Sequence, residues 1–233
     1  MPLTVEQQRA VDRIQEQQGD LGRRAIAAEL GLSEKQVRNY LEAKKAAQEE
    51  HARGPIAPVN VVAWDLETTD FKGDIGRIVI ASFYNFGDGT TVTRTALDFD
   101  TEAGFVGWVA DQYEAADVLV GHNSVSFDKV FLTAVMGRVL PQRILGQRLH
   151  WDTYLIARYG WKGGIGYSLE NLADHFGLPM QKDKPSKHDW REMINLEPDA
   201  VMRLVVRCES DVHITAMLFN RLKPYLHKWK GQA

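Results

Sequence analysis

The sequence has very little cysteine: Cys208 is the only one in 233 residues. A single thiol excludes an intramolecular disulfide framework and a cysteine-based zinc site, and it is typical of proteins kept in a reducing compartment. No stretch approaches about 18 consecutive apolar residues, and the first residues lack the basic-then-apolar order of a secretory signal. The sequence therefore predicts a cytoplasmic protein with no membrane partner.

An excess of charge of either sign is also lacking. The chain has 28 Lys and Arg against 31 Asp and Glu, a formal net charge of −3. This balance is not the strongly basic signature of a passive nucleic-acid binder. It leaves open an enzyme that concentrates acids around metal ions and still binds a phosphate backbone. At this length, a hydrophobic content of 44% favours one principal domain with a small appendage.

Residues 1–50 differ in texture from the rest, being rich in Gln, Ala, Glu and Arg at helical spacing. The pattern predicts a helix over 5–18, a second over 23–30, and a third that is capped by Ser33. With a glycine in the turn before the third helix, this order resembles a helix-turn-helix. Side chains suited to groove reading are expected to be exposed early in the third helix: Lys35, Gln36, Arg38 and Asn39.

Charge does not decide what this helical segment binds, because residues 1–53 hold nine Lys or Arg and nine Asp or Glu. Contact with nucleic acid is the favoured interpretation, and a three-helix bundle used for protein contact is the alternative. A polar stretch broken by glycine and two prolines follows, as expected of a linker. We therefore predict a helix-turn-helix-like domain at 1–50, a linker at 51–58 and a second domain at 59–233.

Two carboxylates, Asp65 and Glu67, lie two residues apart at the end of an apolar run. On a β-strand, residues i and i+2 point to the same face, so these side chains should converge. Two anions at the end of a buried strand repel each other unless a cation lies between them. From this segment alone, an ordinary strand end with two solvated acids remains the alternative.

Two further acids occur in suggestive places. Asp128 follows a short apolar run and a Gly-His-Asn turn, in the first turn of a helix expected to open near Ser126; Asp211 lies inside a long helical pattern among valines and isoleucine. Each alone fits an ordinary explanation, as an N-terminal helix acid or part of a solvated helix face. Together with the first pair they predict a metal site, and an all-carboxylate ligand set favours Mg²⁺ or Mn²⁺ over zinc.

The second domain alternates between strand and helix patterns. Strands are predicted at 60–66, 76–85, 90–97, 117–121 and 149–151. Helices are predicted at 102–114, 126–136, 152–159, 168–176, 187–194 and 198–227. Three consecutive strands followed by strands separated by helices indicate an α/β fold, with a mixed central sheet flanked by helices and the acids at the strand ends.

The ordered motifs resemble those of the DEDD superfamily of 3′–5′ exonucleases: Asp-x-Glu at Asp65 and Glu67, Gly-His-Asn-x-x-x-Phe-Asp ending at Asp128, and Asp211 on the last helix. The resemblance covers about residues 58–227. Its later part looks most like the proofreading domains of B-family DNA polymerases and related free-standing phage and bacterial nucleases. The supporting segments are 151–154, 167–173 and 207–212. The resemblance implies a ribonuclease H-like fold and a phage-like nuclease, in the host cytoplasm if it is phage-encoded.

The resemblance also implies an activity. The enzyme would hydrolyse phosphodiester bonds from the 3′ end and release nucleoside 5′-monophosphates, with DNA favoured over RNA and single strands over duplexes. Two Mg²⁺ or Mn²⁺ ions would act together. Asp65 and Asp211 would hold the first with Glu67 beside them, and Asp65 with a water-relayed Asp128 would hold the second. Replication or repair proteins of unknown identity are possible partners.

Arg207 departs from the family's pattern. Such enzymes normally carry a Tyr four residues before the last Asp, or a His five before it, whereas this chain has Arg207 and Val206. Arginine cannot act as a general base, but at i and i+4 it could pair with Asp211 or clamp a phosphate, so it is counted among the catalytic residues. His213 is turned about 200° from Asp211 on the helix. The other histidines weighed as a base are interpreted as surface or capping residues: His122, His175 and His188.

A glycine-rich loop with aromatic residues follows at 161–167, and the segment after it is basic. Aromatic stacking with lysine contacts to phosphates would suit a single-stranded nucleic acid. A solvated loop with one anchored Trp is the alternative. The candidate contacts are Trp161, Tyr167, Lys184 and Lys187.

Two rival functions remain. A transposase or integrase also places a helix-turn-helix ahead of a ribonuclease H-like core, but its Asp-Asp-Glu set has no Glu two residues after the first Asp. Glu67 and a terminal Asp211 argue against it. A catalytically weak or silent DNA-binding or regulatory protein, with Arg207 marking the silenced site, is the other rival. The four intact acids argue against that reading.

Overall fold

The computed structural model describes residues 2–18, 21–52, 59–164, 166–178 and 185–228. The chain divides into two compact units, Met1–Pro58 and Val59–Ala233, and each is described by itself. Among the helices within the described ranges, none combines the length and apolar character that crossing a membrane would need.

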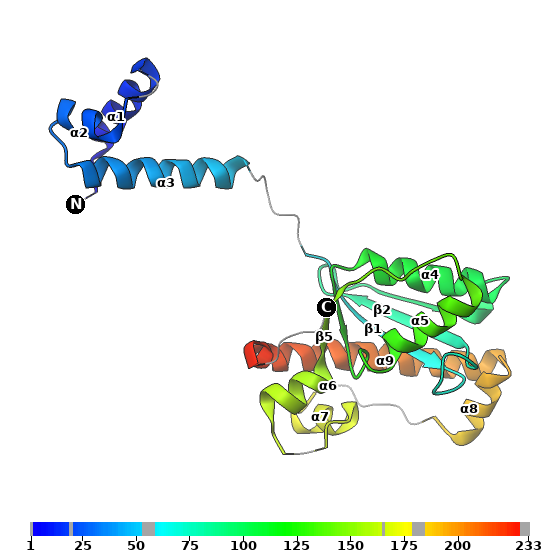
Figure 1. Ribbon diagram of the computed structural model, residues 1–233. Helices are drawn as coiled ribbons and strands as arrows, with labels where there is room; N and C mark the ends of the chain where they lie inside the picture. Colours follow the sequence, from blue (N-terminus) through cyan, green and yellow to red (C-terminus); the bar gives the residue numbers. More distant parts are fainter. Residues whose placement is uncertain (1, 19–20, 53–58, 165, 179–184, 229–233) are drawn as a thin grey trace. The chain divides into compact units, whose positions relative to one another are not determined.

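The first unit contains three helices: α1 (Val5–Gln18), α2 (Arg23–Glu29) and α3 (Glu34–Ala52). Figure 1 shows how the three helices are arranged, and their apolar side chains form a small core. The buried residues of that core are Leu3, Val11, Ile14, Ile26, Ala27 and Val37. Ser33 caps α3 in a reciprocal pair, since its hydroxyl accepts from the Gln36 amide at 3.2 Å and its own amide donates to the Gln36 side chain at 3.2 Å. α3 continues to Ala52, into the predicted linker, and the rest of that linker lies outside the described residues.

The second unit is built on a five-stranded sheet of order β3-β2-β1-β4-β5. The strands are β1 (Val61–Thr68), β2 (Ile78–Asn85), β3 (Thr91–Thr95), β4 (Val118–Gly121) and β5 (Leu149–Asp152). β1 pairs antiparallel with β2, and β2 with β3, whereas β4 runs parallel to both β1 and β5. The predicted mixed sheet of a ribonuclease H-like α/β fold is confirmed.

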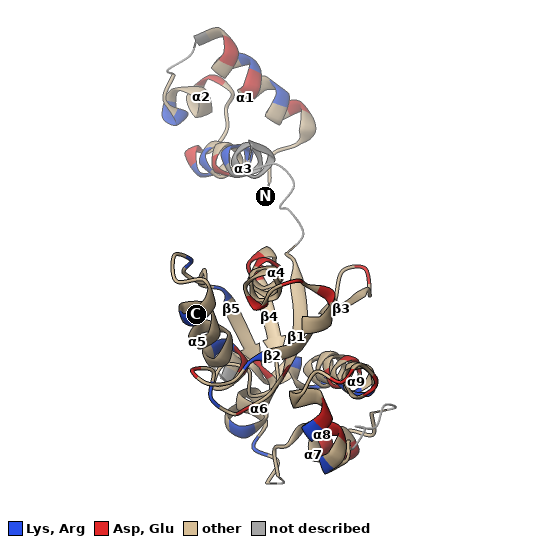
Figure 2. Cartoon of the chain, turned by 90° about the vertical axis from the view of Figure 1, so that its right-hand side faces the viewer, with Lys and Arg blue, Asp and Glu red and all other residues tan. Residues whose placement is uncertain are grey.

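Helices cover both faces of this sheet (Figure 2). The helical elements are η1 (Ala96–Asp98), α4 (Glu102–Ala115), α5 (Asp128–Val139), α6 (Thr153–Leu155), η2 (Ile156–Trp161), α7 (Leu169–His175), α8 (Lys187–Ile194), α9 (Pro198–Leu222) and η3 (Lys223–Lys228). Alternation along β1 explains the two layers. Val62, Trp64 and Leu66 pack with α4 and α5, while Ala63 packs with α9 on the opposite face. Asp65 and Glu67 follow Ala63 at alternate positions, so their side chains lie on the same face of β1, toward α9.

Three predicted helices differ from the structure by two residues or more at one end. The helix expected from residue 126 begins at Asp128, after a turn in which Asn123 takes a left-handed φ of 62°. The helix expected over 152–159 is a single turn, α6, that continues as the π-helical segment η2. The last helix ends at Leu222 and tightens into the 3₁₀ segment η3. Pro224 has no amide N–H to continue the α-helical pattern, which accounts for the change.

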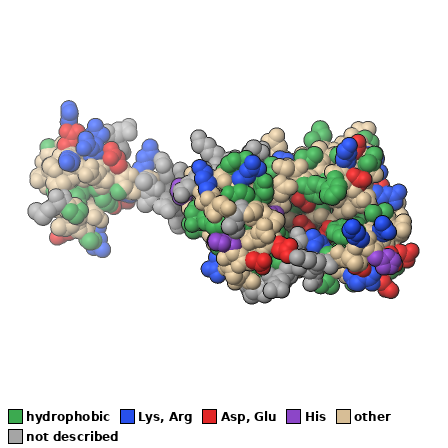
Figure 3. Space-filling model, turned by 90° about the horizontal axis from the view of Figure 1, so that it is seen from below, with side chains coloured by type: hydrophobic (Ala, Val, Ile, Leu, Met, Phe, Trp, Pro, Cys, Tyr) green, Lys and Arg blue, Asp and Glu red, His purple; other side chains and the backbone are tan. Residues whose placement is uncertain are grey.

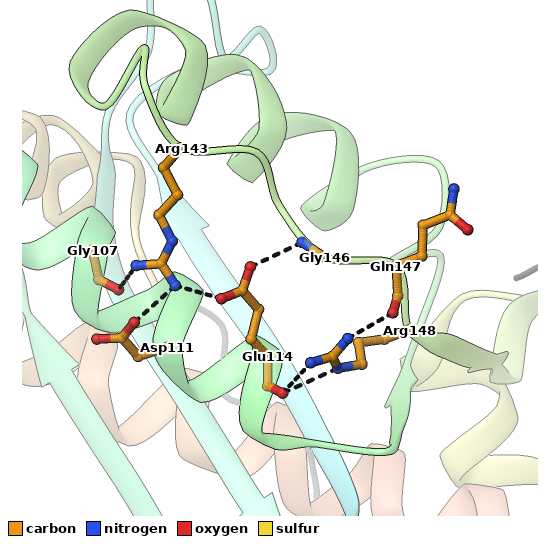
Figure 4. Close-up of polar contacts among 7 residues, drawn as sticks. All are labelled: Gly107, Asp111, Glu114, Arg143, Gly146, Gln147 and Arg148. Atoms are coloured by element: carbon orange, nitrogen blue, oxygen red, sulfur yellow. Dashed lines mark hydrogen bonds and ion pairs between the residues drawn. The ribbon is translucent and has the colours of Figure 1, made fainter.

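A polar network ties the loop that leads into β5 to α4 (Figure 4). The Arg143 guanidinium donates to Glu114 at 2.6 Å and to Asp111 at 2.8 Å, and the second Glu114 oxygen accepts from the Gly146 amide at 2.9 Å. The Gly146 amide and the Arg143 guanidinium keep the pKa of Glu114 below its usual range despite its partial burial. Arg148 donates to the Glu114 carbonyl at 3.0 Å. The network fixes the start of β5, the strand that ends at Asp152.

Candidate metal centre

Three carboxylates meet where β1 passes under α9. One oxygen from each of Asp65, Glu67 and Asp211 lies within 4.8 Å of the others. Glu67 and Asp211 are buried, with 7% and 3% of their surface exposed, and Asp65 is half-buried. These three residues are called the carboxylate cluster below. The structure thus brings together three of the four acids that the sequence singled out.

Asp128 lies beside this cluster rather than in it. It is the first residue of α5, and its Oδ1 accepts from the Leu66 amide at 3.0 Å, so it is held against the backbone between the two β1 acids. Burial raises the pKa of Asp128 to about 7, with the charges of Glu67 and Asp152 adding to the rise and the Leu66 amide opposing it. Its negative charge is therefore costly when no cation is near.

Arg207 bridges two members of the cluster. Its Nε donates to Glu67 Oε1 at 2.9 Å, and its Nη2 lies 3.3 Å from Asp211 Oδ2. The side chain is only 15% exposed, and its guanidinium carbon lies 5.7 Å from the ring centroid of Trp190 on α8. Burial alone would lower the pKa of Arg207, but the cluster's carboxylates outweigh burial and raise it. The ion pair suggested by the i, i+4 spacing is present, and Glu67 is a second partner that the spacing could not reveal.

Cys208 contacts the carboxylate cluster through Asp65. Its thiol is buried, 3.6 Å from both the carbonyl oxygen and Oδ2 of Asp65. Burial raises the pKa of Cys208 well above its ordinary value, and the neighbouring carboxylates add to the rise. The group therefore stays a neutral thiol, which is a weak donor that restrains the orientation of Asp65.

Asp152 is a functional candidate that the sequence reasoning missed. It is fully buried at the end of β5, where Oδ1 accepts from the Asn123 and Tyr154 amides at 2.9 and 3.0 Å and Oδ2 accepts from the Val125 amide at 3.1 Å. Burial raises the pKa of Asp152, although these backbone bonds act against the rise. The carboxylate caps α6 and holds the turn before Asp128. The signal was available, because an Asp that ends a strand and opens a helix is a common N-cap.

A cavity of about 390 Å³ opens beside the cluster, and we call it the acid cleft. It is lined by Asp65, His122, Asn123, Tyr154, Ser168, Leu169 and Asp211. His122, which the sequence analysis interpreted as a surface or capping residue, is half-buried and lines this cleft, beside the turn that Asp152 holds. The Thr153 hydroxyl lies 3.0 Å from the Gly121 carbonyl oxygen and 2.9 Å from His122 Nδ1, so it links the His122 ring to the end of β4.

The other histidines lie elsewhere. His213 Nε2 lies 2.7 Å from the Thr91 hydroxyl on β3 and packs against Tyr84, away from the cluster, in agreement with its helical angle. His175 packs against Trp161, and the exposed His188 lies 3.1 Å from Glu192.

A second cavity of about 480 Å³, the apolar cavity, borders Arg207. Glu67 and Arg207 form its polar edge. Its remaining lining is Leu66, Thr68, Thr69, Asp70, Phe71, Phe127, Trp190 and Ile194. Phe71 is 88% exposed at its mouth. Glu67 and Arg207 thus belong to the lining of this cavity and to the ion-paired carboxylate site at once.

The predicted nucleic-acid contacts of the second unit are dispersed. Tyr167 meets Tyr154, which lines the acid cleft, edge-on, with ring centroids 6.2 Å apart. Trp161 packs against His175 and Phe176, which fits the alternative of an anchored Trp. Lys187 is exposed at the start of α8, and Lys184 lies outside the described residues. On the face in Figure 3, basic and acidic side chains are interspersed rather than gathered into one basic field.

In the first unit, Lys35 and Asn39 are exposed on α3, whereas Arg38 and Gln36 are half-buried. The Gln36 side chain accepts from Ser33 in the cap, so part of its hydrogen-bonding capacity is already used. Lys35, Gln36 and Asn39 line a hollow of about 690 Å³.

No protein-family model and no curated protein matches this sequence. Among solved structures, it is similar to the family B DNA polymerase from the hyperthermophilic archaeon Pyrobaculum calidifontis, with a TM-score of 0.52 and 22% identity over 72% of this chain. It is also similar to Brucella melitensis NrnC, with a TM-score of 0.52 and 18% identity over 73% of this chain and 75% of NrnC.

The matched region spans only 25% of the polymerase, so the likeness concerns one part of that larger protein. At sequence identities this low, the structural likenesses show the fold alone. The mixed sheet of the second unit, flanked by helices and carrying a carboxylate cluster, is therefore a ribonuclease H-like α/β fold, and both likenesses are consistent with the resemblance to the DEDD exonucleases.

Proposed function

We propose that this protein is a metal-dependent 3′–5′ exonuclease that hydrolyses phosphodiester bonds and releases nucleoside 5′-monophosphates. The observation that carries the proposal is the carboxylate cluster, with three acids within 4.8 Å at the edge of a cleft. Three carboxylates so close together are costly without cations, and their oxygens are the ligands that Mg²⁺ and Mn²⁺ prefer. The ligand set therefore fits the implied metal.

In this proposal, Asp65 and Asp211 would hold one ion with Glu67 beside them, and Asp65 with a water-relayed Asp128 would hold a second. The bound ions would supply a water of lowered pKa and stabilise the attacking and leaving oxygens. Cys208 restrains Asp65, and the Leu66 amide restrains Asp128. The protein thereby presents the ligands with little freedom to reorganise.

The remaining residues of the acid cleft would position the substrate. His122, which lines the cleft, would contact the attacking water or a sugar hydroxyl. Tyr154 in the cleft and Tyr167 packed against it would offer ring faces and edges for bases, which suits a single strand whose bases are unpaired. Arg207 would contact the phosphate being cut.

DNA is the proposed substrate in preference to RNA, on the strength of the resemblance to polymerase proofreading domains. The exposed Lys35 and Asn39 of α3 would add contacts to the same nucleic acid. Replication or repair proteins would be the partners of such an enzyme.

The test is digestion of end-labelled single-stranded DNA and RNA in Mg²⁺ or Mn²⁺, with Asp65→Asn beside the native chain. We expect mononucleotide release from the 3′ end, loss of activity with EDTA or a blocked 3′ end, and a fall of about 10³-fold or more in Asp65→Asn. Asp74→Asn, in an exposed loop, is the matched control and should retain native activity. Undiminished activity in Asp65→Asn would refute the site, and efficient cutting of a closed circular strand would refute the exonuclease.

A second candidate deserves its own test because Arg207 already neutralises part of the cluster. In a catalytically silent DNA-binding or regulatory protein, the native chain would bind single-stranded DNA and release no nucleotide with either metal. The transposase or integrase alternative has no supporting observation, since Glu67 lies within the cluster as a DEDD-type site requires.

A further inference from the structure

Arg207 occupies a position that a cation would otherwise take. Its guanidinium reaches Glu67 at 2.9 Å and Asp211 at 3.3 Å, so one positive charge lies between two of the three clustered carboxylates. The side chains involved are 15%, 8% and 5% exposed. Water screens such contacts weakly, so the charges act on one another more strongly than surface pairs do.

The position of this guanidinium is set by the fold. Arg207 lies one turn before Asp211 on α9, and the ring of Trp190 on α8 packs against the guanidinium. Glu67 approaches from β1, 140 residues away in sequence. Arg207 also borders the apolar cavity, so unfilled space adjoins its side chain.

We propose that Arg207 is an internal counter-ion that competes with divalent metal for Glu67 and Asp211, so that loading the site requires the guanidinium to leave them. The inference rests on the proposed metal-dependent function and goes beyond it, because the usual family residue at this position carries no charge. Metal affinity of the free protein is thereby lowered. A substrate phosphate, by attracting the displaced guanidinium, raises that affinity.

The competition follows from charge. An oxygen engaged by a guanidinium at hydrogen-bond distance offers less electron density to a metal, and a fixed positive charge repels an incoming divalent ion. Removing the arginine charge relieves both effects. It also leaves the carboxylates of Glu67 and Asp211 without the guanidinium between them. The metal-free protein therefore becomes less stable, and the metal-bound form becomes more stable.

The test is a titration of the metal-free full chain with Mn²⁺. Binding is measured by calorimetry and by the electron paramagnetic resonance signal of the Mn²⁺ that stays free. Arg207→Met keeps the stem that packs on Trp190 and removes the charge. Arg207→Lys keeps the charge and loses the planar fork. Arg203→Met is the matched control, because Arg203 lies one turn away on the same helix, pairs with Asp189 and Glu192, and is 51% exposed.

We expect Arg207→Met to bind Mn²⁺ about tenfold or more tightly than the native chain, equivalent to about 1.4 kcal/mol. Arg207→Lys should lie between the two, and Arg203→Met should stay within about twofold of the native value. Adding thymidine 5′-monophosphate should tighten Mn²⁺ binding in the native chain more than in Arg207→Met.

Native or weaker Mn²⁺ affinity in Arg207→Met would overturn the competition and show that Arg207 orients the acids for the metal. Equal tightening in Arg207→Met and Arg203→Met would reduce the effect to net charge and would also overturn it. If Arg207→Met does not fold, Arg207→Lys decides, since affinity equal to native would refute the proposal. Absence of Mn²⁺ binding at millimolar concentration in every folded variant would instead refute the metal-dependent function itself.

Discussion

Asp128 is held where its charge is costly. It is 3% exposed beside Glu67 and Asp152, and its pKa is raised to about 7 from an ordinary value near 4. Between these two values the folded protein holds a proton that the unfolded chain releases. Without metal, the free energy of unfolding therefore falls as pH rises from about 4 to 7, and the loss is complete above the folded-state pKa.

Asp128→Asn should remove this dependence while keeping an acceptor for the Leu66 amide. We expect the variant to match the native chain near pH 4 and to exceed it at pH 8 in EDTA by on the order of 3 kcal/mol. Denaturant unfolding at several pH values measures this difference. Asp74→Asn should follow the native curve, and an Asp128→Asn curve that also follows it would show that the buried carboxylate costs nothing.

Glu67 should behave in the opposite way, because it is paired. Truncation to Ala leaves the buried guanidinium of Arg207 with one fewer carboxylate. We expect Glu67→Ala to reduce the free energy of unfolding of the metal-free protein by roughly 1–3 kcal/mol, and its melting temperature should fall accordingly. A higher melting temperature in Glu67→Ala would mean that like-charge repulsion in the cluster outweighs the pairing with Arg207.

At the scale of elements, β5 and the turn after β4 act as one unit through Asp152. Its carboxylate accepts backbone bonds from Asn123, Val125 and Tyr154, so one side chain fixes both the start of α6 and the turn that carries His122 into the acid cleft. Loss of these bonds should disturb the cleft as well as the fold.

We expect Asp152→Ala to lower stability by about 2–4 kcal/mol and to reduce nuclease activity at least tenfold at a temperature where the variant is fully folded. Asp98→Ala is the matched control, because Asp98 accepts from the Thr95 amide at 2.7 Å in the capping box of η1 and lies outside the residues that line the acid cleft. It should lose stability and keep activity. Equal activity losses in the two variants would indicate a general effect of destabilisation.

At the scale of the molecule, the two units have separate cores. The apolar residues buried in residues 1–58 pack among themselves, and those of 59–233 form their own clusters on the sheet. Each unit therefore contains the burial that it needs to fold.

Deletion of residues 1–58 should leave a folded chain that still digests single-stranded DNA. Affinity for DNA should fall, most clearly at low salt, since lysine and arginine contacts to phosphates release counterions. A salt titration of DNA binding, compared between the two chains, measures the change in slope. Identical slopes would assign the first unit to protein contact rather than to nucleic acid.

Much of the fold could be predicted because its signals are local. Apolar alternation in 61–68 marks β1 and puts Asp65 and Glu67 on one face, and the 3.6-residue period of 198–222 marks α9. Capping residues such as Ser33 located helix starts. The failures were also local in origin. Helical periodicity continues beyond Leu222, so the last helix was predicted too long. The left-handed turn at Asn123 was not predicted.

The sequence alone was enough to identify the acids, because carboxylates in strand and helix patterns are visible residue by residue. Tertiary packing decided how they are used. It joined Arg207 to Glu67, set Asp128 against the Leu66 amide, and turned His122 into the acid cleft. These contacts link segments from different elements, and their distances depend on how β1, α5 and α9 pack. A local pattern specifies which face a side chain occupies, but only the packed fold specifies which group it meets there.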